Sequence, residues 1–137
     1  MSLLSIKGVY GLMSMFEISK GDQKNPVSLK DISQNIGVSK NYLEQVLNTL
    51  RNTGFVSSIK GLKGGYFLNK TLDEITFYDI FYALENDFGL TSLNVEHSSY
   101  NLFFKEYNEK LTELFSKPLS SFKEYQSQDK KYLNYVI

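Results

Sequence analysis

The pattern of apolar and polar residues between Val27 and Leu68 predicts a helix, a tight turn, a second helix and a two-stranded hairpin. Apolar residues recur at helical spacing over residues 29–36 and 40–53, and a serine able to cap a helix precedes each stretch. Gly37 and Gly54 end the two helices, because glycine adopts the positive φ that a helix end often requires. The short gap between the helices is typical of a helix-turn-helix.

The second predicted helix has two distinct faces. Its buried stripe, with i, i+3, i+4 and i+7 spacing, consists of Leu43, Val46, Leu47 and Leu50. The opposite side carries Asn41, Glu44, Gln45, Asn48 and Asn52. Amide side chains are well suited to hydrogen-bond with the edges of DNA bases. An ordinary solvated face has the same composition, but its position after a tight turn and before a basic hairpin favours a surface that reads DNA.

The hairpin is predicted from two β-branched and aromatic runs, residues 55–59 and 66–68. The loop between them contains Lys60, Gly61, Lys63, Gly64 and Gly65. A glycine-rich loop can instead cradle a nucleotide phosphate, but this one joins two strands and no Gly-Lys-Ser/Thr motif follows. We therefore interpret the hairpin as the wing of a winged helix-turn-helix, with Val27 expected to join its sheet as a short strand.

The rest of the chain is predicted to be mainly helical. Helices are expected over residues 3–19, 77–86 and 100–116, and another after Pro118, whereas residues 87–99 show no clear period and read as a loop. The buried stripe of the first helix is expected to be Tyr10, Leu12, Met13 and Phe16. After Pro118, the residues expected to share one side are Leu119, Phe122 and Tyr125.

The long helix over residues 100–116 carries an apolar seam with three–four spacing. The seam consists of Phe104, Tyr107, Leu111 and Leu114, and Phe103 and Phe115 widen it. The helix could fold back onto its own domain, or it could pair with the same helix of a second chain. A winged domain of about seventy residues can close its own core, which favours the homodimer.

Composition and charge narrow the function classes. The net charge is zero, but residues 1–70 hold nine basic and four acidic residues, a balance of +5, whereas the remainder holds six and eleven, a balance of −5. Only the first part suits a polyanion such as DNA. The chain has no cysteine and a single histidine, which excludes a thiolate-held cluster and a His-based zinc site or triad within one chain. We expect neither an enzyme nor a bound cofactor.

The apolar run at residues 1–16 does not read as a secretion signal. Lys7 interrupts it, and no small-residue cleavage site follows. No stretch reaches the apolar length needed to cross a bilayer. We therefore expect a cytoplasmic protein with no membrane partner.

Five stretches together form a specific combination of motifs. They are Lys7–Leu12 (KGVYGL), Val27–Ser33 (VSLKDIS), Asn41–Gly61 (NYLEQVLNTLRNTGFVSSIKG), Gly64–Leu68 (GGYFL) and Glu74–Ile80 (EITFYDI). In these motifs the chain resembles the Rrf-two family of winged helix-turn-helix transcription regulators, which includes IscR, NsrR and CymR. The similarity covers most of residues 5–86, and the later part of the chain matches only in its order of helices.

The resemblance implies a homodimeric, sequence-specific DNA-binding transcription regulator, expected to be a repressor, on a palindromic double-stranded operator. Together with the analysis of the helix face and wing above, it gives the expected DNA-binding residues Ser39, Lys40, Asn41, Tyr42, Glu44, Gln45, Asn48, Lys60 and Lys63. Lys60 stands where some relatives place an arginine in the minor groove, and Leu62-Lys63 replaces the usual Pro-Gly of the wing. Lysine is more strongly hydrated than arginine, so placing it in the minor groove costs more. The sequence is therefore consistent with a wing that reads bases and with one that only binds phosphate.

The largest departure from the family concerns signal sensing. Cluster-binding relatives place three cysteines where this chain has residues 87–99 and none, so an iron–sulfur cluster held in the usual way is excluded. Family members without cysteine respond to partner proteins or small molecules. His97 lies in this segment, either as a surface residue or as a ligand, and the C-terminal YLNYVI has no assigned role.

The expected fold class is mainly α with a small β wing. The expected domains are a winged helix-turn-helix DNA-binding domain (1–86), a sensor-like loop region (87–99), and a dimerisation helix with a C-terminal tail (100–137). The alternative function is a winged-helix protein-interaction module without direct DNA binding. The basic wing beside an amide-rich helix face favours DNA.

Overall fold

The computed structural model describes the backbone of residues 2–136 and the side chains of residues 2–129. The C-terminal YLNYVI, whose role the sequence leaves unassigned, has its side chains outside this described part. The helices are α1 (Ile6–Ile18), α2 (Leu29–Ile36), α3 (Lys40–Asn52), α4 (Phe77–Glu85), α5 (Ser98–Leu114), a 3₁₀ turn η1 (Leu119–Phe122) and α6 (Lys123–Val136). The strands are β1 (Val56–Ile59) and β2 (Gly65–Leu68).

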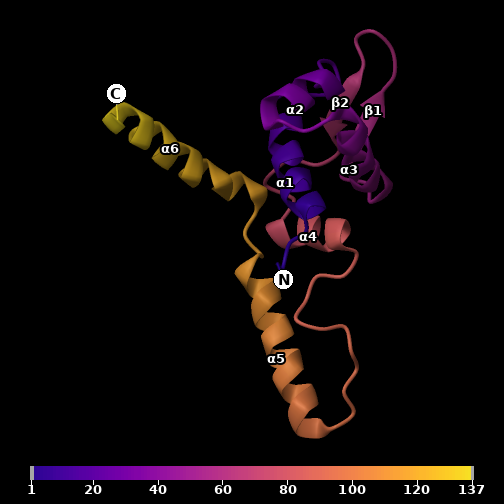
Figure 1. The fold of residues 1–137 in the computed structure, drawn as a ribbon, viewed down its shortest axis with the longest axis vertical. Coiled ribbons are helices and arrows are strands. Elements are labelled where there is room, and N and C mark those ends of the chain that lie inside the picture. The colour runs from indigo at the N-terminus through magenta and orange to yellow at the C-terminus, as the bar shows by residue number, and fades with distance from the viewer. Residues whose placement is uncertain (1, 137) are drawn as a thin grey trace.

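Two parts are visible in Figure 1. Helices α1 to α4 and the hairpin gather into one domain, whereas α5 lies below this domain and α6 extends to its side. Strands β1 and β2 pair antiparallel, from Val56 opposite Leu68 to Ile59 opposite Gly65. Val27 adds the expected short bridge to Tyr66, with N···O distances of 2.9 and 2.8 Å. The mainly α fold with a β wing is as predicted.

The predicted helix ends are largely confirmed. The Ser28 side chain accepts a hydrogen bond from the Asp31 N–H at 3.1 Å, and the Ser39 side chain accepts from the Tyr42 N–H at 3.3 Å. Gly37 ends α2 with a left-handed φ of 73°. Ser28 and Asp31 form only this one bond of a capping box, whereas Thr76 and Asp79 form a complete box at the start of α4.

The buried face of α1 differs from the predicted one. Met13 is 38% exposed, while Met15 and Ile18 are fully buried. Small residues explain the rotation, because they let α1 approach α4 closely. A Cβ atom added at Gly11 would lie 2.2 Å from Leu84 Cδ1, so only glycine fits at this crossing. Leu12 and Phe16 of the predicted stripe are partly buried against the core, whereas Met13 is not, so the prediction was right in part.

The core of the winged domain also includes residues from beyond α4. Leu119 is fully buried, and its N–H donates to the Ile75 carbonyl at 2.8 Å. Phe81, Phe88 and Phe115 form an aromatic cluster, with ring centroids 5.3 to 5.7 Å apart. Phe115 therefore packs on its own domain and does not widen the α5 seam, which corrects the prediction.

Helix α5 has no buried residue, and it starts two residues earlier than predicted. Its C-terminal end is fixed to the domain, because the Tyr78 N–H donates to the Phe115 carbonyl at 2.8 Å and Thr76 forms a bridge with Pro118. Asn108 accepts from the Leu90 N–H at 2.6 Å and so holds the preceding loop against the helix. Within the described residues, no helix combines the length and apolar character that crossing a membrane requires.

Candidate nucleic-acid interface

The exposed face of α3 is divided into two flanks. Successive 100° rotations place Lys40, Glu44 and Arg51 on one flank, and these we name the charged flank. The other flank, which we name the amide flank, consists of Asn41, Gln45, Asn48 and Asn52. All seven side chains are exposed, while the opposite side of the helix (Leu43, Val46, Leu47 and Leu50) is fully buried, as predicted. The helix therefore presents a polar face fixed by a packed one.

Other predicted contact residues lie at the start of α3. Ser39 is exposed and caps the helix. Tyr42 is half-buried, and its ring packs edge-on against Tyr10 of α1, with the centroids 6.3 Å apart. Tyr42 thus contributes to the packing between α1 and α3, and only part of its ring is on the surface.

The wing loop is shaped by glycine at two positions. Gly61 has a φ of 113°, which side-chain-bearing residues rarely adopt. A Cβ atom added at Gly64 would lie 2.1 Å from the Ile59 carbonyl oxygen, and the Gly64 N–H donates to the Gly61 carbonyl at 3.0 Å. This tight turn leaves Lys60 and Lys63 exposed at the tip, on either side of a fully exposed Leu62.

A groove of about 490 Å³ separates α3 from the wing. The start of α2, two residues of the charged flank of α3 and the wing line this groove. It brings together Lys30, Glu44, Arg51, Ser58, Lys60 and Tyr66. The Arg51 guanidinium donates to the Ser58 hydroxyl at 3.0 Å and so links α3 to β1. Of the predicted residues, Glu44 and Lys60 line this groove, while the amide flank and Lys63 do not.

The sequence analysis missed Lys30, Arg51, Ser58 and Tyr66. Arg51 follows Glu44 by seven residues, which puts both on one helix face, so helical spacing could have identified it. Burial raises the pKa of the Tyr66 hydroxyl, and the Glu44 carboxylate raises it further, while Arg51 opposes them. Tyr66 therefore keeps its proton at neutral pH and can act as a hydrogen-bond donor.

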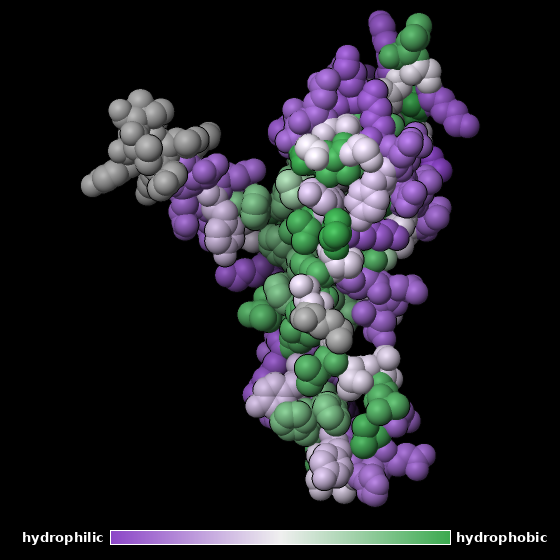
Figure 2. Space-filling view, viewed as in Figure 1, coloured by the Kyte–Doolittle hydropathy of each residue, from purple (hydrophilic) through white to green (hydrophobic). Residues whose placement is uncertain are grey.

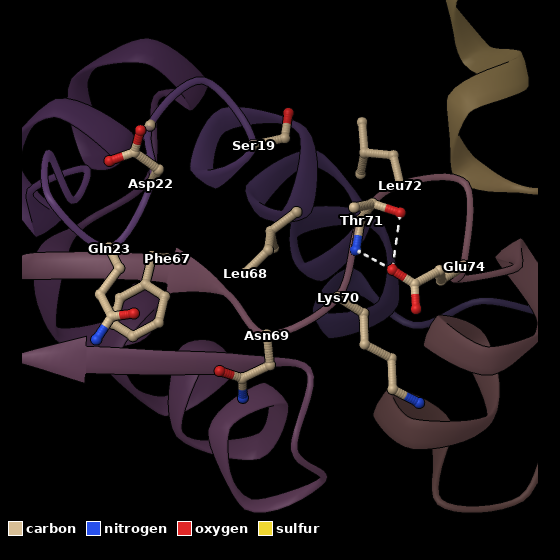
Figure 3. Close-up of a pocket in the computed structure, with 11 residues that line it drawn as sticks. Ser19, Asp22, Gln23, Phe67, Leu68, Asn69, Lys70, Thr71, Leu72 and Glu74 are labelled. Atoms are coloured by element: carbon tan, nitrogen blue, oxygen red, sulfur yellow. Dashed lines mark hydrogen bonds between the residues drawn. The ribbon is translucent and has the colours of Figure 1, made fainter.

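A second hollow, of about 520 Å³, lies at the other end of the hairpin, between the loop after α1 and the segment after β2 (Figure 3). Its carboxylates are engaged by their own loops. Glu74 accepts from the Thr71 N–H at 3.1 Å and hydroxyl at 3.0 Å, and these bonds lower the pKa of Glu74. Asp22 accepts from the N–H groups of Lys24 and Asn25. The polar groups here shape turns.

The predicted seam lies along α5. Phe104 and Leu111 are half-buried, whereas Tyr107 and Leu114 are 43% and 67% exposed. Phe103 packs against Tyr107 with centroids 4.8 Å apart. An apolar groove of about 570 Å³ is lined by Leu90, Phe103, Tyr107, Lys110, Leu111 and Leu114, and Phe104 is not part of its lining.

The segment expected to act in sensing has few chemical groups. His97 is exposed just before α5, and its ring lies edge-on to Tyr100 with centroids 6.2 Å apart. Within the described residues, no three His, Cys, Asp or Glu side chains gather in a way that could hold a metal ion.

The chain is similar to known transcriptional regulators in sequence. The profile of the Rrf2 family, described as an iron-dependent transcriptional regulator, matches residues 4–128. The HTH-type transcriptional regulator CymR of Bacillus subtilis is 48% identical over 82 residues, 60% of this chain and 59% of that protein. IscR of Photorhabdus laumondii is 39% identical over 88 residues, 64% of this chain and 54% of that protein. The alignments thus span little more than half of each relative.

Solved structures agree over more of the chain. The structure of CymR, described as the global cysteine regulator of B. subtilis, matches with a TM-score of 0.75 and 35% identity over 91% of this chain and 98% of that chain. IscR of T. potens matches with a TM-score of 0.71 and 31% identity over 90% of this chain and 87% of that chain. The predicted resemblance is confirmed, and this cysteine-free chain belongs to the Rrf2 family of transcriptional regulators.

Proposed function

We propose that the protein is a homodimeric, sequence-specific transcription repressor that binds double-stranded DNA in the cytoplasm and has no catalytic role. The observation that carries the proposal is the exposed amide flank of α3, held beside a basic wing in a chain of the Rrf2 family. A helix of this width fits the major groove, where each base pair presents its own pattern of donors and acceptors.

The proposed contacts divide into two kinds. Asn41, Gln45 and Asn48 read base edges, since amides both donate and accept hydrogen bonds. Glu44 can accept from the amino group of cytosine. The phosphate contacts come from Ser39, Lys40, Tyr42, Lys60 and Lys63. Phosphate contacts set the position of the protein on DNA, while base contacts set its sequence preference.

In this proposal, residues 1–86 form the DNA-binding domain and residues 100–137 the dimerisation region. Two copies pair through Phe104, Tyr107, Leu111 and Leu114, and the exposed apolar surface of Tyr107 and Leu114 supports the pairing. A two-fold dimer presents two copies of α3, and the matching operator is a palindrome. Residues 87–99 lie beside α5 and would respond to a partner protein or a small molecule.

The proposal is tested by mapping the bound sites across the genome and then measuring affinity for the recovered site. Several lysines of each subunit lie near the DNA phosphates in this proposal. We therefore expect the logarithm of the affinity to fall with the logarithm of the salt concentration, with a slope of about −4 to −8 for the dimer. A random duplex is the control and should bind far more weakly. Absence of a shared palindromic site, or binding that barely changes with salt, would instead indicate a protein-interaction module.

A further inference from the structure

The groove between α3 and the wing carries an excess of positive charge. Lys30, Arg51 and Lys60 line it together with one carboxylate, that of Glu44. Glu44 and Arg51 are seven residues apart on α3, which separates them by roughly 10 Å along the helix axis. The end of the groove at Arg51 is therefore the end at which an anion is favoured.

Arg51 is suited to a phosphate group by both type and placement. It is the single arginine of the chain, and its planar guanidinium binds phosphate through two parallel hydrogen bonds. Among the described residues, the Ser58 hydroxyl is its hydrogen-bond acceptor, at 3.0 Å. The other N–H donors of the guanidinium are thus available to a ligand.

The position of the groove indicates which phosphate would occupy it. The amide flank of α3, which we propose reads bases, lies on one side of the protein groove, and the wing tip lies on the other side. When α3 enters the major groove of DNA and the wing faces the neighbouring groove, one sugar–phosphate strand must pass between them. The cavity between α3 and the wing is the space in this domain that can hold that strand.

We propose that the protein groove between α3 and the wing holds the sugar–phosphate strand that separates the major groove of DNA from the neighbouring groove. In this arrangement Arg51 binds one phosphate of the strand, and Ser58 positions the Arg51 side chain. Lys30 at the start of α2 adds charge to the same protein groove. This inference rests on the proposed DNA-binding function and adds a contact separate from base reading by the amide flank. It also explains why α3 and β1 are joined by a side-chain hydrogen bond at this point.

The test compares Arg51→Ala, Arg51→Lys and Ser58→Ala with the wild-type protein, using the operator and a random duplex over a salt series. Arg51→Ala should weaken binding to both duplexes about equally, and reduce the size of the salt slope by about 0.9 per subunit. Arg51→Lys should keep the slope, because the charge is retained. Ser58→Ala should also keep the slope while weakening binding severalfold. Lys70 is an exposed lysine outside the groove, and Lys70→Ala is the matched control. It should change neither the affinity for either duplex nor the salt slope.

A second measurement identifies the phosphate. Operators carrying one neutral methylphosphonate at successive positions should include one position that weakens the wild type and leaves Arg51→Ala unaffected. The inference is overturned if Arg51→Ala keeps the wild-type slope, or if Arg51→Ala and Ser58→Ala behave alike because both only loosen the wing. Failure of the proposed function is a different result, because the wild type itself would then bind no operator.

Discussion

The winged domain and α5 use apolar residues in opposite ways. In the domain, large apolar side chains such as Met15, Leu47 and Ile80 are fully buried. In α5 none is buried, and Leu114 is 67% exposed. Figure 2 shows mainly hydrophilic side chains around α2 in the upper part, both hydrophilic and apolar ones at the wing, and apolar ones down the middle and lower part.

This difference indicates which region is complete within one chain. The core of the domain is closed, and among the described residues no buried side-chain N or O lacks a hydrogen-bond partner. Burying apolar area contributes about 25 cal/mol per Å². The exposed seam of α5 can therefore stabilise the protein only when another surface covers it. Variants in each region should therefore fail differently, and the failures can be ranked.

The largest effect is expected from Leu111→Asp in the α5 seam. The change places a carboxylate in each half of the proposed interface, where an unpaired charge is very unfavourable. The protein should be a monomer at micromolar concentration by light scattering. Operator affinity should fall by roughly 10³-fold or more, towards the non-specific level.

Leu102→Asp is the matched control. Leu102 is 67% exposed and lies on the side of α5 opposite the seam, so the same substitution there should leave a dimer with normal operator binding. A folded dimer with normal binding for Leu111→Asp would show that α5 pairs through another face.

Gly11→Val should destabilise the winged domain and leave the α5 seam unchanged. The new side chain would overlap Leu84, which is buried between α1 and α4. Such overpacking costs about 2 kcal/mol of unfolding free energy, measured by urea denaturation. Gln34→Val on the exposed face of α2 is the control and should cost well under about 1 kcal/mol. Equal losses for both would mean that the crossing of α1 and α4 adapts.

Gln45→Ala should separate recognition from folding. Gln45 is exposed, so its truncation should leave the unfolding temperature unchanged. If it reads a base edge, affinity for the operator should drop by about 1–3 kcal/mol, with little change on random DNA. Equal weakening on both duplexes would show that Gln45 contacts the sugar–phosphate backbone of DNA and not a base.

Lys60→Ala is expected to have the smallest effect. A wing lysine that only grips phosphate should weaken operator and random DNA almost equally and reduce the salt slope by about 0.9 per subunit. Titrations at several salt concentrations measure both quantities. A loss confined to the operator would show that the wing reads sequence as well.

The local signals in the sequence predicted the winged domain well. Ser28 and Ser39 cap the helices that they were expected to cap, and Gly37 and Gly54 have the positive φ expected at helix ends. The buried stripe of α3 is as predicted because helical spacing alone determines which residues share a face. For the candidate interface, the same spacing placed the amide flank on the surface.

The sequence-based predictions were wrong where packing between segments far apart in the chain determines which residues are buried. Phe88 lies in a segment without helical period, yet it is buried against Phe81 and Phe115. Nothing local to Phe88 reveals partners at the other end of α5. Likewise, the face that α1 buries depends on how closely α4 approaches Gly11, and the groove lining at Ser58 and Tyr66 depends on how the hairpin folds over α3.

Leu119 fills the core from a position far along the chain. It packs among residues such as Met15 and Ile80, which leave the ribosome long before it during synthesis. At about 5–20 residues per second, the core then waits a few seconds for its last member. All of α5 emerges in that interval, with its apolar seam uncovered. The winged domain can therefore complete its core only after the whole of α5 has been made, so we expect chains that stop before Leu119 to fold less stably than chains that include it.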